Sequence, residues 1–236
     1  MQYDGISLPY VHFIHLCLCL CKLSILQSLH GQHYVHLDVK PDNFMLGVGE
    51  LSDQVFLIDF GLAQLFRNLV TRRHIVQTYG SSVIGTVRYS SINCHLGLTP
   101  SRRDDLESLV YVIVYLVKGS LPWQGIIVKP SQIHQDEVMR LKQATTVKAL
   151  CEGLPQSFVE FVEHIQCLGF RDKPDYSTSA FAPSSRSVCC QCHRHSQIHG
   201  LMRHRSGAVR LSSEHRQLEV GLSNNLLKTN KSGGGI

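Results

Sequence analysis

Two short polar motifs lie close together in the first third of the chain. The first, His36–Asn43, reads His-Leu-Asp-Val-Lys-Pro-Asp-Asn, and the second, Asp59–Gly61, reads Asp-Phe-Gly. Asp38 could accept a proton from an incoming hydroxyl group, which is the task of a general base. Lys40 follows it closely and could steady a negatively charged group at the same place. The first motif therefore offers a base and a cation side by side.

The two motifs also supply oxygen donors for a metal. Asn43 and Asp59 carry the amide and carboxylate oxygens that Mg²⁺ prefers. The residues between them predict two short strands, Phe44–Leu46 and Val55–Ile58, joined by a turn over Gly47–Asp53. Such a hairpin would hold the two donors on adjacent loops. A base, a cation and a magnesium site together suit phosphoryl transfer, which depends on positioning and charge neutralisation. The alternative is that the aspartates of both motifs are ordinary loop and turn acids.

In this order, the two motifs resemble the catalytic loop and the metal-binding loop of protein kinases. Further segments resemble one family of serine/threonine kinases, the casein kinase I family, and the resemblance extends from about Lys22 to Tyr176. The segments are Gly85–Asn93 (Gly-Thr-Val-Arg-Tyr-Ser-Ser-Ile-Asn), Ser101–Leu109, Gly119–Gly125 and Asp172–Tyr176.

The resemblance implies an activity, two cofactors and a class of partner. A member of this family transfers the γ-phosphate of ATP to Ser or Thr residues of proteins and uses Mg²⁺. The implied catalytic residues are Asp38 as the base and Lys40 as the phosphate contact, and the implied metal and cofactor ligands are Asn43 and Asp59. The implied partners are protein substrates that are acidic or already phosphorylated.

Four more residues acquire roles from the resemblance. Asp105 falls where kinases keep an acid that accepts hydrogen bonds from the catalytic-loop backbone; the alternative is an acid that favours the helix dipole. Arg88, with Gly119 and Ser120, resembles a substrate anion site, since an arginine and backbone donors suit phosphate. The alternative for Arg88 is an ordinary surface charge.

The chain departs from the family in two places. Leu37 stands where the family has an arginine, so charge cannot organise the segment that follows the second motif. The residues before Asp38 contain no Gly-rich loop and no Val-Ala-x-Lys-like strand. We therefore expect an N-terminal lobe to be missing, which makes the activity of this chain doubtful. The alternative function is a catalytically inactive kinase fragment that binds substrates or partners, and a third possibility is a fragment without a stable fold.

Helical periodicity accounts for the elements that must hold these residues. Leu23, Leu26 and Leu29 lie at helical spacing and predict an amphipathic helix. This helix is expected to end near His30, where Gly31 can cap it. Three later helices are predicted at Arg103–Val117, Gln135–Lys142 and Ser157–Leu168.

The predicted fold class is α+β, with a protein kinase-like, mainly helical C-lobe and no N-lobe. The predicted helix Arg103–Val117 is apolar on most sides, which places it inside a domain. The long stretch Asp59–Asn93 shows little periodicity. The predicted organisation is an atypical segment over residues 1–21, a partial kinase domain over 22–176, and a basic, disordered tail over 177–236.

Charge and cysteine content bear on partners and compartment. Residues 1–179 hold 15 Lys and Arg against 16 Asp and Glu, whereas residues 180–236 hold 8 against 2. We interpret this basic tail as solvated, and expect neither a nucleic acid nor a membrane as partner. The apolar stretch Leu8–Cys21 is short and interrupted by His12 and His15, which argues against a membrane span. Nine cysteines in no framework favour a reducing intracellular location, cytoplasm or nucleus.

Overall fold

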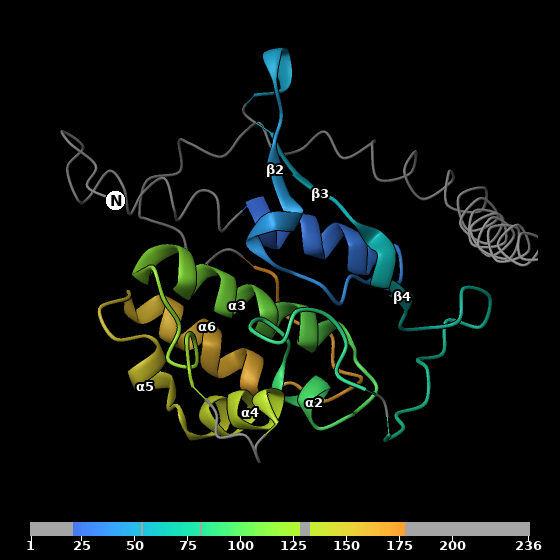
Figure 1. Cartoon of the computed structure of the whole chain (residues 1–236). Coiled ribbons are helices and arrows are strands. Elements are labelled where there is room, and N and C mark those ends of the chain that lie inside the picture. The colour runs from blue at the N-terminus through green and yellow to red at the C-terminus, as the bar shows by residue number, and fades with distance from the viewer. Residues whose placement is uncertain (1–20, 53, 81, 128–132, 178–236) are drawn as a thin grey trace, which may run out of the picture. The chain divides into compact units, whose positions relative to one another are not determined.

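The computed structural model describes residues 21–52, 54–80, 82–127 and 133–177 (Figure 1). All of these belong to the first of two units of the chain, Met1–Cys192. The predicted tail, apart from Ser177, and the predicted N-terminal segment, apart from Cys21, lie outside the described residues.

The first described element is a helix over residues 21–31. Leu23, Leu26 and Leu29 are all buried, which confirms the predicted amphipathic helix. The predicted cap at Gly31 is wrong, because the left-handed residue that reverses the chain is His33, with φ 74°. The His33 ring is buried and accepts a hydrogen bond from Arg67 Nε (2.8 Å), which offsets the unfavourable backbone conformation.

Two small antiparallel sheets follow. β2 (Phe44–Leu46) pairs with β3 (Val55–Leu57), so that Phe44 lies opposite Leu57 and Leu46 opposite Val55. This pair confirms the predicted hairpin. β1 (Tyr34–Val35) pairs with β4 (Gln64–Leu65). The second pair was not predicted, since two-residue strands are too short to show a period.

Helices make up most of the remaining fold. They are α2 (Ile92–His95), α3 (Arg102–Lys118), α4 (His134–Ala144), α5 (Val147–Leu150) and α6 (Gln156–Cys167), with 3-10 turns at Pro41–Asn43, Gly49–Leu51 and Phe60–Leu62. The predicted helices correspond to α3, α4 and α6, each within one or two residues at its ends. The four-residue helices α2 and α5 were not predicted.

The helix α3 lies at the centre of the helical layer. It packs against α2 and α6, while α2 also packs against α4 and α5 against α6. In Figure 1, α3 lies between the β2–β3 hairpin, which projects away from it, and the helices α2, α4, α5 and α6. Residues of α3 are buried on nearly all sides from Leu106 to Val114, as its sequence predicts. Gly119, with φ 78°, ends the helix in the left-handed conformation that glycine adopts without strain.

This mixture of helices with two small sheets agrees with the predicted α+β class. The connector predicted over Asp59–Asn93 is mostly irregular, although it contains β4, a 3-10 turn and the start of α2. No helix in the described part of the chain is both long and apolar enough to cross a membrane.

Candidate active site

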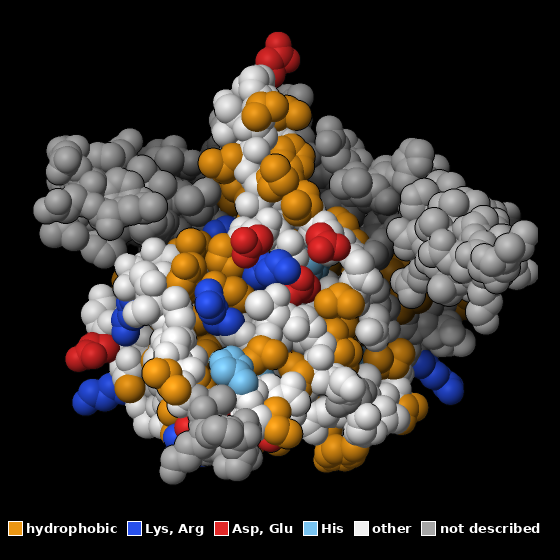
Figure 2. Space-filling model, viewed as in Figure 1, with side chains coloured by type: hydrophobic (Ala, Val, Ile, Leu, Met, Phe, Trp, Pro, Cys, Tyr) orange, Lys and Arg blue, Asp and Glu red, His pale blue; other side chains and the backbone are white. Residues whose placement is uncertain are grey.

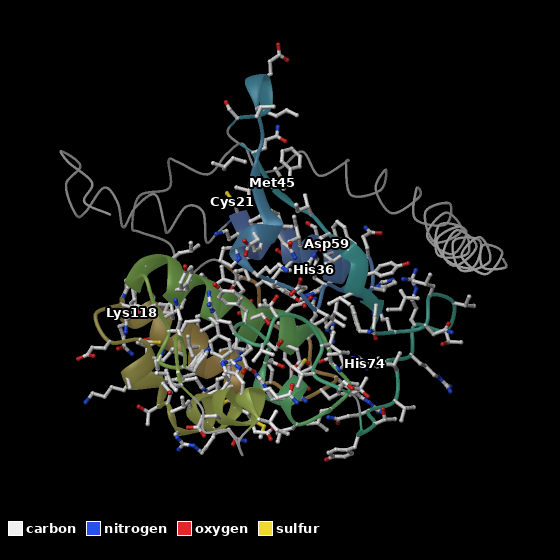
Figure 3. The ribbon with its side chains drawn as sticks, viewed as in Figure 1. Cys21, His36, Met45, Asp59, His74 and Lys118 are labelled. Atoms are coloured by element: carbon white, nitrogen blue, oxygen red, sulfur yellow. The ribbon has the colours of Figure 1, made fainter. Side chains whose placement is uncertain are left out.

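The base of the β2–β3 hairpin brings the two sequence motifs together. The 3-10 turn Pro41–Asn43 leads directly into β2, and Asp59 follows the end of β3. Ile58 N donates to Asn43 O (2.9 Å), and His36 Nε2 lies 3.0 Å from Ile58 O. Figure 3 shows His36 and Asp59 close together below the hairpin, whose first strand carries Met45 further out.

Asp38 is fixed by donors on both carboxylate oxygens. Lys40 Nζ lies 2.7 Å from Oδ2, while Thr86 donates to Oδ1 through its backbone N (2.9 Å) and through Oγ1 (2.7 Å). Burial disfavours the charged carboxylate, but the hydrogen bonds from Lys40 and Thr86 outweigh it and lower the pKa of Asp38. Asp38 is therefore a charged, oriented acceptor with little freedom to rotate.

Lys40 lies in an acidic environment. The hydrogen bond with Asp38 raises the pKa of Lys40, and the charges of Asp42 and Asp59 act in the same direction against the effect of burial. Its Nζ also lies 3.4 Å from Thr86 Oγ1. Lys40 is thus a fixed positive charge beside the carboxylate.

The two predicted metal ligands differ in their surroundings. Asn43 is buried, and its Nδ2 donates to Asp38 O (2.8 Å) and Oδ2 (3.3 Å). Asp59 is exposed, has φ 57°, and accepts a hydrogen bond from Gly61 N (3.1 Å). The described residues contain no group of three or more His, Cys, Asp or Glu side chains that is placed to hold a metal ion. An amide and a carboxylate oxygen fit Mg²⁺, which takes few protein ligands and keeps its waters.

Asp105, in the first turn of α3, anchors the backbone of the first motif. Its Oδ2 accepts from His36 N (2.7 Å), and its Oδ1 accepts from Leu37 N (2.8 Å). Its Oδ2 also lies 2.9 Å from His30 Nε2, and His30 Nδ1 lies 2.6 Å from Tyr176 Oη. This buried network links the first helix, α3 and the last described residues to the loop that carries Asp38.

Leu37 occupies an apolar cluster. It has φ 68° and is buried against Val35 and Phe66, with Ile84 packed on the same cluster. At the position where the resemblance leads one to expect an arginine, this chain therefore joins the loop to the later connector by apolar contact.

Arg88 lines a cavity of about 450 Å³ that extends from the first motif. The lining residues are Pro41, Asp42, Thr86, Val87, Arg88, Tyr89, Tyr115, Trp123, Gln124, Gly125, His134 and Val138. The Arg88 guanidinium lies 5.9 Å from the ring centre of Tyr89 and 6.0 Å from that of Tyr115. Gly119 and Ser120, at the end of α3, are not among these lining residues, so their part in an anion site stays a prediction.

Thr86 is the site residue that sequence reasoning missed. It contacts Asp38 across 48 positions of sequence. Thr86 lies in the segment Gly85–Asn93, but the resemblance of that segment assigned no role to its hydroxyl. The preceding Gly85 could have given a signal. Gly85 has φ 81°, and a Cβ there would lie 2.2 Å from Leu37 O, so only glycine lets the chain approach Asp38 this closely.

Figure 2 shows the distribution of side chains on this face. Lysine, arginine and acidic side chains gather below the hairpin, and the hairpin itself is covered with apolar side chains. Met45, Leu46 and Val48 are among its exposed apolar residues. Charged side chains of both signs are thus concentrated below the hairpin, although others lie elsewhere on this face.

Comparison with known protein families gives one finding. The family model for the protein kinase domain matches residues 18–179, which is well over half of the chain.

Proposed function

The chain belongs to the protein kinase family, and from this premise we propose that it is a serine/threonine kinase of casein kinase I type. The reaction is transfer of the ATP γ-phosphate to Ser or Thr residues of protein substrates. Protein kinase domains in general act on proteins and use ATP and Mg²⁺. The observation that carries the proposal is the fixed Asp38 carboxylate, held between Lys40 and Thr86, of which Thr86 also lines the Arg88 cavity.

Each residue of the site has a distinct task in this proposal. Asp38 accepts the proton of the substrate hydroxyl, and Lys40 stabilises the charge of the transferring phosphate. Asn43 and Asp59 are the residues that would hold Mg²⁺, which neutralises phosphate charge when bound. Asp105 keeps the backbone of the loop in place through His36 N and Leu37 N.

The Arg88 cavity supports a preference for acidic or already phosphorylated substrates. Arg88 is an exposed cation, and His134 lines the same cavity. An arginine beside aromatic rings is a suitable contact for a carboxylate or a phosphate. We also propose an intracellular location, in the cytoplasm or nucleus, on the basis of the free cysteines Cys21, Cys94, Cys151 and Cys167.

Transfer of labelled phosphate tests this proposal directly. The purified chain, incubated with γ-labelled ATP, Mg²⁺ and an acidic protein, is expected to label serine or threonine. Asp38→Asn is expected to lower the rate at least roughly 100-fold, because the substrate hydroxyl then has no base. Glu152→Gln, an exposed acid after α5, is the matched control and should leave the rate unchanged.

The same assay separates the alternative of an inactive binding module. Nucleotide binding is measured independently, by calorimetry with Mg-ATP. If the substrate stays unlabelled and the chain shows no saturable binding of Mg-ATP, the kinase proposal is contradicted. If such a chain still bound acidic peptides, the alternative would be supported.

A further inference from the structure

The backbone of residues 87–90 is fastened through its carbonyl groups. Lys142 Nζ donates to Val87 O (2.9 Å) and to Ser90 O (2.5 Å). Trp123 Nε1 donates to Arg88 O (2.9 Å), which lies between them. Three carbonyls of one short segment are thus held by two side chains from elsewhere in the fold.

Lys142 is buried in a way that is unusual for lysine. Its exposed fraction is 3%, and its Nζ lies 4.9 Å from the ring centre of Tyr111 and 5.3 Å from that of Trp123. Its third polar neighbour is His95 Nε2, at 3.1 Å. An ammonium group has three donors, and here three acceptors meet them. In the described part of the chain, no carboxylate lies within ion-pair distance of Lys142.

The charge of Lys142 is costly to bury. Burial lowers the pKa of Lys142 to about 7, although the charge of Glu107 acts in the opposite direction. The Glu107 carboxylate is itself occupied, since it accepts from Ile92 N (2.8 Å) and Tyr111 Oη (2.6 Å). The contacts that compensate Lys142 are therefore mainly the two backbone carbonyls and the two aromatic rings.

The segment that Lys142 holds is one wall of the Arg88 cavity. Val87, Arg88 and Tyr89 all line the cavity, whereas Lys142 does not. The helix α4 supplies another part of the lining through His134 and Val138. A single helix therefore carries two residues of the cavity and the side chain that fixes the wall containing Arg88.

We propose that Lys142 is a positioning residue, which holds the Val87–Ser90 backbone so that Arg88 is presented to an acidic protein substrate. This inference rests on the proposed function, because it takes the Arg88 cavity as the substrate site. Lys142 then governs substrate affinity without touching the substrate. Asp38 receives its hydrogen bonds from Lys40, Asn43 and Thr86, and the hydrogen bonds of Lys142 involve none of these three residues. Thr86 O accepts from Tyr89 N (2.8 Å) and Ser90 N (2.9 Å), so a second set of hydrogen bonds joins Thr86 to the held segment.

The chain contains its own reporter of this site. Trp123 is the only tryptophan in the sequence, and it both contacts Lys142 and donates to Arg88 O. Its fluorescence can be followed while the full chain is titrated with a serine peptide flanked by aspartates. A lysine-flanked peptide serves as the ligand control. The dissociation constant comes from saturation, so a changed starting intensity in a variant does not affect it.

Lys142→Met keeps the length and apolar stem of the side chain but removes all three donors. We expect the variant to bind the acidic peptide at least roughly tenfold more weakly, because two carbonyls of the segment that carries Arg88 then lose their charged hydrogen-bond donor. Where phosphate transfer is measured, the KM for the peptide should rise by the same factor, while kcat changes less than about twofold. Lys148→Met, at an exposed lysine of α5, should leave the dissociation constant unchanged.

Thermal melting followed by circular dichroism shows whether the variant folds. If Lys142→Met does not melt cooperatively, Lys142→Gln takes its place and is judged by the same roughly tenfold loss of peptide affinity. The glutamine amide keeps two donors, but on a side chain that is shorter than that of lysine. If the wild-type and Lys142→Met proteins bind the acidic peptide with equal affinity, this inference is overturned and the kinase proposal still stands. A folded wild-type chain that neither binds the acidic peptide nor transfers phosphate would overturn both.

Discussion

At the scale of single residues, the site depends on how Asp38 is held. Its carboxylate is a weak base whose orientation is fixed by Lys40 on one oxygen and Thr86 on the other. Asp38 and Lys40 could be predicted because they belong to one short motif with recognisable chemistry. Thr86 could not, because its role arises only when a distant irregular segment folds back onto the loop.

Removing the Thr86 hydroxyl should change the pH dependence of the reaction. Hydrogen bonds to Asp38 lower its pKa in the folded protein, so the carboxylate loses its charge only below the usual range for aspartate. Thr86→Val keeps the backbone donor and removes Oγ1, so we expect the pKa of Asp38 to rise. The acid limb of the pH–rate profile should move to higher pH, with kcat roughly tenfold lower.

Thr71→Val is the control for this variant, because Thr71 is exposed on the connector and has no contact with Asp38. It should leave the profile in place. An acid limb that stays at the wild-type pH in Thr86→Val would show that Oγ1 does not set the titration of Asp38.

At the scale of elements, the periodicity of the sequence predicted the long helices and missed the helices of a single turn. The apolar pattern of α3 spans several turns, and its bounds follow from Ser101, whose backbone N–H donates to Asp104, and from Gly119 at its end. The helices α2 and α5 span a single turn, so no pattern repeats within them. Their positions depend on packing against α4 and α6, which a local sequence pattern does not contain.

Asp105 and Asp136 offer a matched test of what an acid in the first turn of a helix does. Both lie in the first turn of their helices, but Asp105 is buried in its network, whereas Asp136 is exposed. Asp105→Asn should lower the free energy of unfolding by roughly 3 kcal/mol, because two backbone N–H groups and His30 lose a charged acceptor. Asp136→Asn should cost under about 1 kcal/mol, the contribution of the helix dipole.

Urea unfolding of the two variants measures this difference. Equal costs would mean that Asp105 acts only through the helix dipole, which is the alternative that its sequence position leaves open. A large cost confined to Asp105→Asn would assign the stability to the loop network.

At the scale of the whole molecule, the described unit combines a buried helical layer with an exposed apolar hairpin. Leu46 and Val48 have exposed fractions of 60% and 86%, and Figure 2 shows apolar side chains over much of this projection. Contiguous apolar surface of this kind favours association. The sequence predicted the hairpin itself, but the exposure of its outer residues depends on what packs around it.

We expect the hairpin to limit the solubility of the chain. The double variant Leu46→Lys and Val48→Lys should raise the concentration at which light scattering begins, because like charges oppose contact between hairpins. Val70→Lys is the control, since Val70 is 90% exposed but lies on the connector. If all variants scatter at the wild-type concentration, the hairpin is not the surface through which the chain associates.

The network of Asp105, His30 and Tyr176 also has a consequence for the order of events during protein synthesis. His30 leaves the ribosome 146 residues before Tyr176, with which it shares a hydrogen bond. At ordinary elongation rates this interval is roughly 7 to 30 seconds. During that time the loop that carries Asp38 exists on the nascent chain without its complete set of anchors. The network that anchors this loop is therefore completed only after Tyr176 has been added.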